Sequence, residues 1–155
     1  MSQKIKDDIH RVLVRVLEDW GLMMVDPADG STVEENFASE VPFYIASLKF
    51  DGIVKGSYSA ICQEEFAHTL TSNLVGDSGE PSDEEVQDAL KELVNVMSGN
   101  LLTETWGVDH VFALSSPEVK KVSKDEVGES LKRNAFFLKG DDQPVAFSFM
   151  VDNEE

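Results

Sequence analysis

Residues 81–107 read PSDEEVQDALKELVNVMSGNLLTETWG, and this pattern predicts one long helix. Ser82 and Glu85 stand at the spacing of a capping box, in which each side chain bonds the other residue's free backbone N–H at a helix start. Gly107 offers a stop at the far end. At about 100° per residue, one side of the helix is apolar and is expected to face the core. The residues on that side are Val86, Leu90, Leu93, Met97 and Leu101.

A polar stripe lies opposite the apolar side and consists of Asp88, Glu92, Asn95 and Gly99. Asn is a below-average helix former, and Gly costs about 1 kcal/mol relative to Ala in a helix interior. Residues that break a local rule in this way are typical of functional sites. A Glu-x-x-Asn pair by itself also arises by chance in so acidic a chain, so on the pattern alone a merely solvated polar face is an equal alternative.

The charge of the chain is strongly negative, because 30 acidic residues stand against 13 basic ones, for a formal net charge of −17. Such a charge repels nucleic-acid phosphates and anionic lipid headgroups, so neither nucleic acid nor a membrane is expected as a partner. No apolar run approaches the roughly 20 residues of a membrane-spanning helix, and the start of the chain lacks the apolar stretch of a signal peptide. We therefore expect a cytoplasmic protein. Its length of 155 residues suits a single domain over residues 1–155.

Outside the long helix, the sequence predicts further helices and antiparallel strands, which together indicate an α+β fold. An antiparallel sheet would carry about three helices on one face, the long helix among them. The other two helices are expected over residues 5–20 and 63–75, each ended by a glycine. A β-hairpin with an Asp-Gly turn is expected over residues 43–62, and a closing hairpin over residues 136–151.

The remaining segments give weaker signals. Residues 26–41 are expected to form an irregular, solvated segment, residues 123–133 are ambiguous, and residues 152–155 are expected to be a frayed tail. Pro144 indicates an edge position in the closing hairpin, because proline has no N–H to donate to a neighbouring strand. Short strands are expected at residues 22–25, 110–114 and 118–122.

Residues for self-contained catalysis are missing or scattered. His10, His68 and His110 lie far apart in the sequence without a His-x-x-x-His or Cys-x-x-Cys motif, so no metal site is expected. The single Cys62 is expected to pack in the core. No Gly-x-Ser-x-Gly motif or phosphate-binding glycine loop is present in the sequence. The polar stripe offers only a carboxylate, an amide and a glycine, which suit the positioning of a water at the reactive centre of another molecule.

The spacing Asp88-x-x-x-Glu92-x-x-Asn95, followed by Gly99 and by Ser116-Pro117 about twenty residues on, resembles the signature of the CheC/CheX/FliY phosphatases of bacterial chemotaxis. The likeness extends over nearly the whole chain, although the acidic segment at residues 26–41 has no obvious counterpart. A CheC-like protein carries two such helices. The first helix here has Glu18 followed by Gly21 where an Asn would be needed, and a single copy is the CheX pattern.

The resemblance implies a phosphatase whose substrate is the phosphorylated aspartate of a CheY-like response regulator, in chemotaxis or two-component signalling. It implies that Asn95 orients the attacking water and that Glu92 pairs with a lysine of the regulator. Gly99, one turn beyond Asn95, is expected to leave room for close approach of that partner. Asp88 is expected either to contact the partner or to serve only the surface and first turns of the helix, where acids are favoured. Mg²⁺ would be held by the regulator, so no cofactor of this chain's own is expected. A catalytically silent module that docks a regulator or a flagellar-switch component is the alternative.

The likeness to CheX also implies a homodimer. Residues 145–151, VAFSFMV, form an uncharged apolar run that would aggregate as an open edge strand. Pairing in a dimer would protect this run, and burial as an internal strand of the monomer would protect it equally well.

Overall fold

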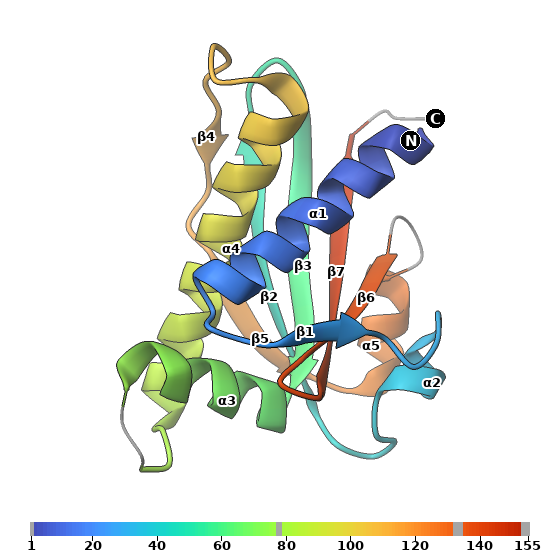
Figure 1. Cartoon of the computed structure of the whole chain (residues 1–155), viewed down its shortest axis with the longest axis vertical. Coiled ribbons are helices and arrows are strands. Elements are labelled where there is room, and N and C mark those ends of the chain that lie inside the picture. The colour runs from blue at the N-terminus through green and yellow to red at the C-terminus, as the bar shows by residue number, and fades with distance from the viewer. Residues whose placement is uncertain (1, 77–78, 132–134, 153–155) are drawn as a thin grey trace.

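The computed structural model of the chain describes residues 2–76, 79–131 and 135–152, and these residues form a mixed α+β fold (Figure 1). The helices are α1 (Gln3–Asp19), α2 (Val33–Asn36), α3 (Glu64–Val75), α4 (Asp83–Trp106) and α5 (Lys124–Ser130). The strands are β1 (Val25–Pro27), β2 (Phe43–Asp51), β3 (Lys55–Gln63), β4 (Ala113–Leu114), β5 (Glu118–Val122), β6 (Ala135–Gly140) and β7 (Gln143–Val151).

One antiparallel sheet runs through the middle of the molecule. Within the described residues its order is β1-β6-β7-β3-β2, and β4 and β5 pair in succession along the outer side of β2. The two predicted hairpins, β2–β3 and β6–β7, are both present. They are joined through β3 and β7, whose register pairs Gly56 with Val151 and Cys62 with Val145. Residues 145–148 of the apolar run pair on both sides, with β3 and with β6, so β7 is an internal strand of the sheet.

Three helices, α1, α3 and α4, cover one face of the sheet, as predicted (Figure 1). Every second residue of the central strands points to these helices, for example Tyr44 and Ala46 of β2 and Phe147 of β7. The predicted apolar side of α4 is buried, with each of its five side chains at most 1% exposed. Full burial of such a side chain contributes about 1.5–3 kcal/mol, so this face fixes how α4 lies on the sheet.

The opposite face of the sheet carries the two short helices, α2 and α5, which were not predicted. A second apolar cluster joins Phe43, Ile61 and Ala146 of the strands to Val127 of α5 and to Phe37, the residue after α2. The prediction that residues 26–41 are wholly irregular is therefore wrong. In that segment Thr32 starts α2 by accepting a hydrogen bond from the backbone N–H of Glu35.

Two predictions about strands also need correction. Pro144 does not mark an edge, because β7 lies between β6 and β3. It is tolerated there since the pairing of β7 with β3 begins one residue later, at Val145, so that no partner strand needs its N–H. The first strand lies at Val25–Pro27 rather than at residues 22–25, because Leu22 adopts a positive φ of 56° that is incompatible with a strand.

Smaller differences concern the ends of elements. Only Ala113–Leu114 of the strand expected at residues 110–114 pairs with β2. Of the expected tail, Asp152 is described, and residues 153–155 lie outside the described part of the chain. None of the described helices is both long enough and apolar enough to cross a membrane.

Candidate functional site

The long helix α4 is held firmly at its start. The hydroxyl of Ser82 accepts a hydrogen bond from the Glu85 N–H at 3.2 Å, and the Glu85 carboxylate accepts one from the Ser82 N–H at 3.0 Å. This is the predicted capping box. Tyr44 of β2 adds a hydroxyl contact to the Asp83 carboxylate at 3.5 Å, which ties the first residue of the helix to the sheet.

The other end of α4 is held by neighbouring elements. Trp106, its last residue, packs against Phe112, Phe149 and Phe50 at ring-centroid distances of 5.7, 6.1 and 6.5 Å. Gly107 then ends the helix with a φ of 91°, a conformation that glycine adopts readily. Because both ends and the buried face are fixed, side chains on the outer face of α4 project from a rigid support.

The predicted polar stripe lies on this outer face. Asp88, Glu92 and Gly99 are exposed and Asn95 is half-buried. At a rise of about 1.5 Å per residue, the stripe is about 16 Å long. Within the described parts of the chain, nothing forms a hydrogen bond or an ion pair with the side chains of Asp88, Glu92 or Asn95. The donors and acceptors of these three side chains are therefore available to another molecule.

Asn95 stands where the outer face of α4 meets the buried one. Its helix neighbours Val94 and Ser98 are buried, at 0% and 1% exposure. The backbone under Asn95 is thus packed on one side, while its amide group reaches solvent. An amide in this position can donate and accept hydrogen bonds without carrying a charge.

Gly99 has no structural role that the fold explains. A Cβ built on it meets nothing within 4 Å. Gly56 of β3 behaves in the opposite way, because a Cβ there would collide with the Met150 carbonyl oxygen and the Phe50 ring. The sheet therefore requires glycine at position 56, whereas α4 would form with any good helix former at position 99.

The exposed surface of the first half of α4 is acidic. Its first turn carries Asp83, Glu84 and Glu85, and the stripe adds Asp88 and Glu92. Acids in a first turn are favourable to the helix because they face the positive end of its dipole. Beyond that turn they create a negative field, which attracts a basic partner and repels an acidic one.

Ser116 and Pro117, which belong to the resemblance, lie away from the stripe. Ser116 lines a groove with Ser47 and Ser59. These two serines alternate with the strand residues under α4, so they point to the other face of the sheet. The structure therefore does not bring the Ser-Pro pair into the polar stripe.

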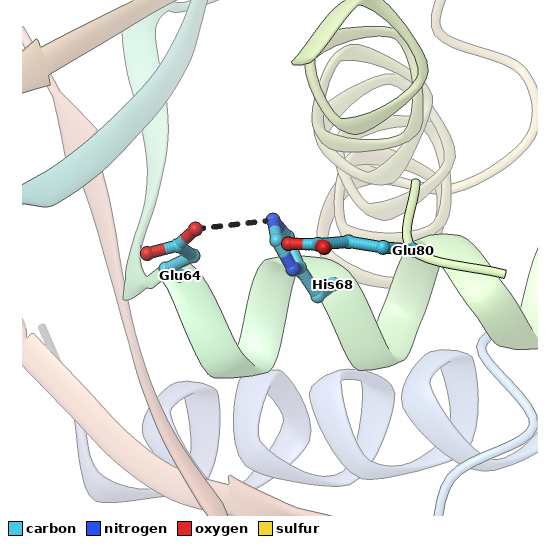
Figure 2. A group of neighbouring side chains, drawn as sticks. All are labelled: Glu64, His68 and Glu80. Atoms are coloured by element: carbon cyan, nitrogen blue, oxygen red, sulfur yellow. Dashed lines mark ion pairs between the residues drawn. The ribbon is translucent and has the colours of Figure 1, made fainter. Parts of the chain in front are cut away.

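A second group of polar side chains was missed by the sequence analysis, which expected no metal site. Glu64 and His68 of α3 lie beside Glu80, which precedes α4, and one ligand atom from each lies within 4.8 Å of the other two (Figure 2). The spacing Glu64-x-x-x-His68 places two ligand types on one helix face and was the available signal. The position of Glu80 follows only from how α3 and α4 pack. His10 and His110 are exposed and belong to no such group among the described residues.

Comparison with known proteins finds a matching family model and solved structures with a similar fold. A family model described as "Chemotaxis phosphatase CheX" matches residues 44–139. No curated protein matches the chain. A solved chemotaxis protein CheX from Desulfovibrio desulfuricans is similar at 17% identity over 96% of this chain and 99% of its own, with a TM-score of 0.69.

Two further solved structures share the fold. One is a CheX-CheY-BeF3-Mg²⁺ complex from Borrelia burgdorferi, at 20% identity over 94% of this chain and 96% of that one, with a TM-score of 0.65. The other is FliY from Thermotoga maritima, at 16% identity over 97% and 90% of the two chains, with a TM-score of 0.57. Because the CheX model matches more than half of the sequence and includes all of α4, this chain belongs to the CheX family of chemotaxis phosphatases.

Proposed function

We propose that this chain hydrolyses the aspartyl phosphate of a CheY-like response regulator. The observation that carries the proposal is the free amide of Asn95, fixed on α4 one helical turn from the exposed carboxylate of Glu92. Membership of a family of chemotaxis phosphatases supports the reaction. The Borrelia burgdorferi relative, a complex of CheX with CheY, BeF3 and Mg²⁺, supports the class of partner.

Asn95 is proposed to orient the attacking water. Phosphoryl transfer depends mainly on positioning and on stabilising charge, so a group that holds water in line with the scissile bond accelerates it. The water oxygen bonds to phosphorus, the bond from phosphorus to the aspartate oxygen breaks, and inorganic phosphate and a free carboxylate result. A neutral amide suits this task because a carboxylate at position 95 would repel the phosphoryl oxygens.

Glu92 is proposed to anchor the regulator. Its exposed carboxylate lies on the same helix face as Asn95 and is free to pair with a lysine of the partner. Asp88 extends the same acidic surface by one turn, and Gly99 would let the partner's backbone approach α4 closely. The Mg²⁺ needed for phosphoryl transfer would remain on the regulator.

The test uses CheY-like regulators phosphorylated with acetyl phosphate and follows loss of the aspartyl phosphate with and without the chain. Asn95→Ala should reduce the stimulated rate by about two orders of magnitude or more, because the water loses its positioning group. Asn100→Ala is the matched control, since its amide lies on the same helix but donates to the Val96 carbonyl oxygen at 2.7 Å. This control should keep the stimulated rate.

Two outcomes would refute the proposal. One is an Asn95→Ala variant that dephosphorylates the regulator as fast as the wild type. The other is a wild-type chain that binds the beryllofluoride-loaded regulator but does not accelerate the loss of phosphate from the phosphorylated regulator. That result would establish the silent docking module instead. Circular dichroism of each variant separates loss of activity from loss of the fold.

A further inference from the structure

The group formed by Glu64, His68 and Glu80 lies apart from the polar stripe and has no part in the proposed reaction. Glu64 and His68 stand one turn apart on α3, and the Glu64 Oε1 atom lies 3.5 Å from the His68 Nε2 atom. Figure 2 shows the Glu80 carboxylate reaching toward the same ring from the segment that precedes α4. The side chain of His68 is 25% exposed and that of Glu64 is 59% exposed, so the group is open to solvent on one side.

The distances suit a small tetrahedral ion. Zinc lies about 2.0–2.2 Å from nitrogen and oxygen ligands, so two ligand atoms of one tetrahedral site stand about 3.3–3.5 Å apart. The Glu64–His68 pair already has this separation. The third ligand atom, from Glu80, is within 4.8 Å of the others, and the exposed Glu80 side chain can move inward by rotating its own bonds.

The ligand types point to a particular class of ion. Two carboxylates in one place repel each other. A divalent cation would compensate both. An imidazole ligand favours zinc and its neighbours in the first transition row over Mg²⁺ and Ca²⁺, which prefer all-oxygen sites.

We propose that Glu64, His68 and Glu80 bind a divalent cation of the zinc class, with water in the remaining position. The ion joins the first two turns of α3 to the residue two before the Ser82 cap of α4. Its effect is to fix the start of the long helix against α3. The inference does not rest on the proposed phosphatase activity, because none of its three residues belongs to the stripe.

The test titrates the metal-free protein with ZnCl₂ in a calorimeter. The wild type should bind one ion per chain, and His68→Ala should weaken that binding by more than about tenfold through loss of one of three ligands. His110→Ala is the matched control, because His110 is an exposed histidine outside the group, and it should bind as the wild type does. Glu64→Gln, a change at an exposed carboxylate, should weaken binding in the same way without disturbing the core.

A second readout follows stability, since an ion that binds only the folded state raises the unfolding temperature. Zinc should raise this temperature in the wild type and in His110→Ala and leave it unchanged in His68→Ala. Zinc affinity that is equal in the wild type, His68→Ala and Glu64→Gln would overturn the proposal, because it would assign the binding to the general acidity of the surface. A shift of the unfolding temperature by Mg²⁺ equal to that by zinc would overturn the assigned class of ion.

Discussion

Gly99→Ala should make this protein more stable and a weaker partner for the response regulator. Ala is favoured over Gly in a helix interior by about 0.8–1 kcal/mol. The new methyl group meets nothing within 4 Å, so no collision offsets that gain. For a chain of this size, about 1 kcal/mol corresponds to a rise of about 2–4 °C in the unfolding temperature.

The effect on docking should have the opposite sign. If the regulator's backbone lies against Gly99, the methyl group overpacks a close interface, at a cost of about 1–3 kcal/mol. The dissociation constant should then rise about five- to 150-fold. The assay pairs thermal unfolding, followed by circular dichroism, with calorimetric titration of a beryllofluoride-loaded regulator.

Gly128→Ala supplies the matched control. Gly128 is also an exposed helix glycine whose added Cβ meets nothing within 4 Å, but it lies on α5, across the sheet from α4. It should gain stability without losing affinity. If Gly99→Ala binds the regulator as tightly as the wild type, the partner does not reach this end of the stripe. A fall in the stability of Gly99→Ala would refute the inference that its surroundings are open.

Three further predictions concern docking, packing and assembly. Glu92→Gln should weaken regulator affinity more than it slows turnover in the bound complex, because removing one charge of a desolvated ion pair costs several kcal/mol. Saturation kinetics that show only a turnover defect would make Glu92 a catalytic residue instead. Tyr58→Phe should raise the free energy of unfolding in urea by about 1 kcal/mol, since the buried Tyr58 hydroxyl has no partner in the described structure, and a loss would reveal a hidden one. A homodimer stays a prediction from the family likeness; light scattering at micromolar concentration should give twice the mass of one chain, and the mass of a single chain would exclude it.

The parts of the fold that the sequence predicted are those determined locally. The capping box at Ser82 and the two hairpins depend on residues within a few positions of one another. The short helices depend on distant contacts instead. In α5, KDEVGES, Val127 is the one apolar side chain, which gives no periodic pattern, and it is buried only because the second face of the sheet receives it. Pro144 was misread for a related reason, since its tolerance depends on where the pairing with β3 begins.

The two candidate sites also differ in whether their residues lie close together in the sequence. The stripe from Asp88 to Gly99 lies on a single helix, so helical periodicity alone placed its residues on one face. The group of Glu64, His68 and Glu80 draws on two segments, and residues 77–78 between them lie outside the described chain. No spacing rule links Glu80 to His68, so their approach could be learned only from the packing of α3 against α4.

The pairing of β3 with β7 has a consequence for how the protein is made. Gly56 pairs with Val151, and all of α4 lies in the long stretch of chain between them. During synthesis α4 leaves the ribosome well before β7 does. Until β6 and β7 have emerged, the apolar face of α4 can pack only on a sheet that lacks these strands. Closing so distant a contact is slow compared with forming a local hairpin. The sheet should therefore be completed only after β7 has emerged, and until then the unpaired hydrogen-bonding edge of β3 is the segment that a chaperone would have to shield.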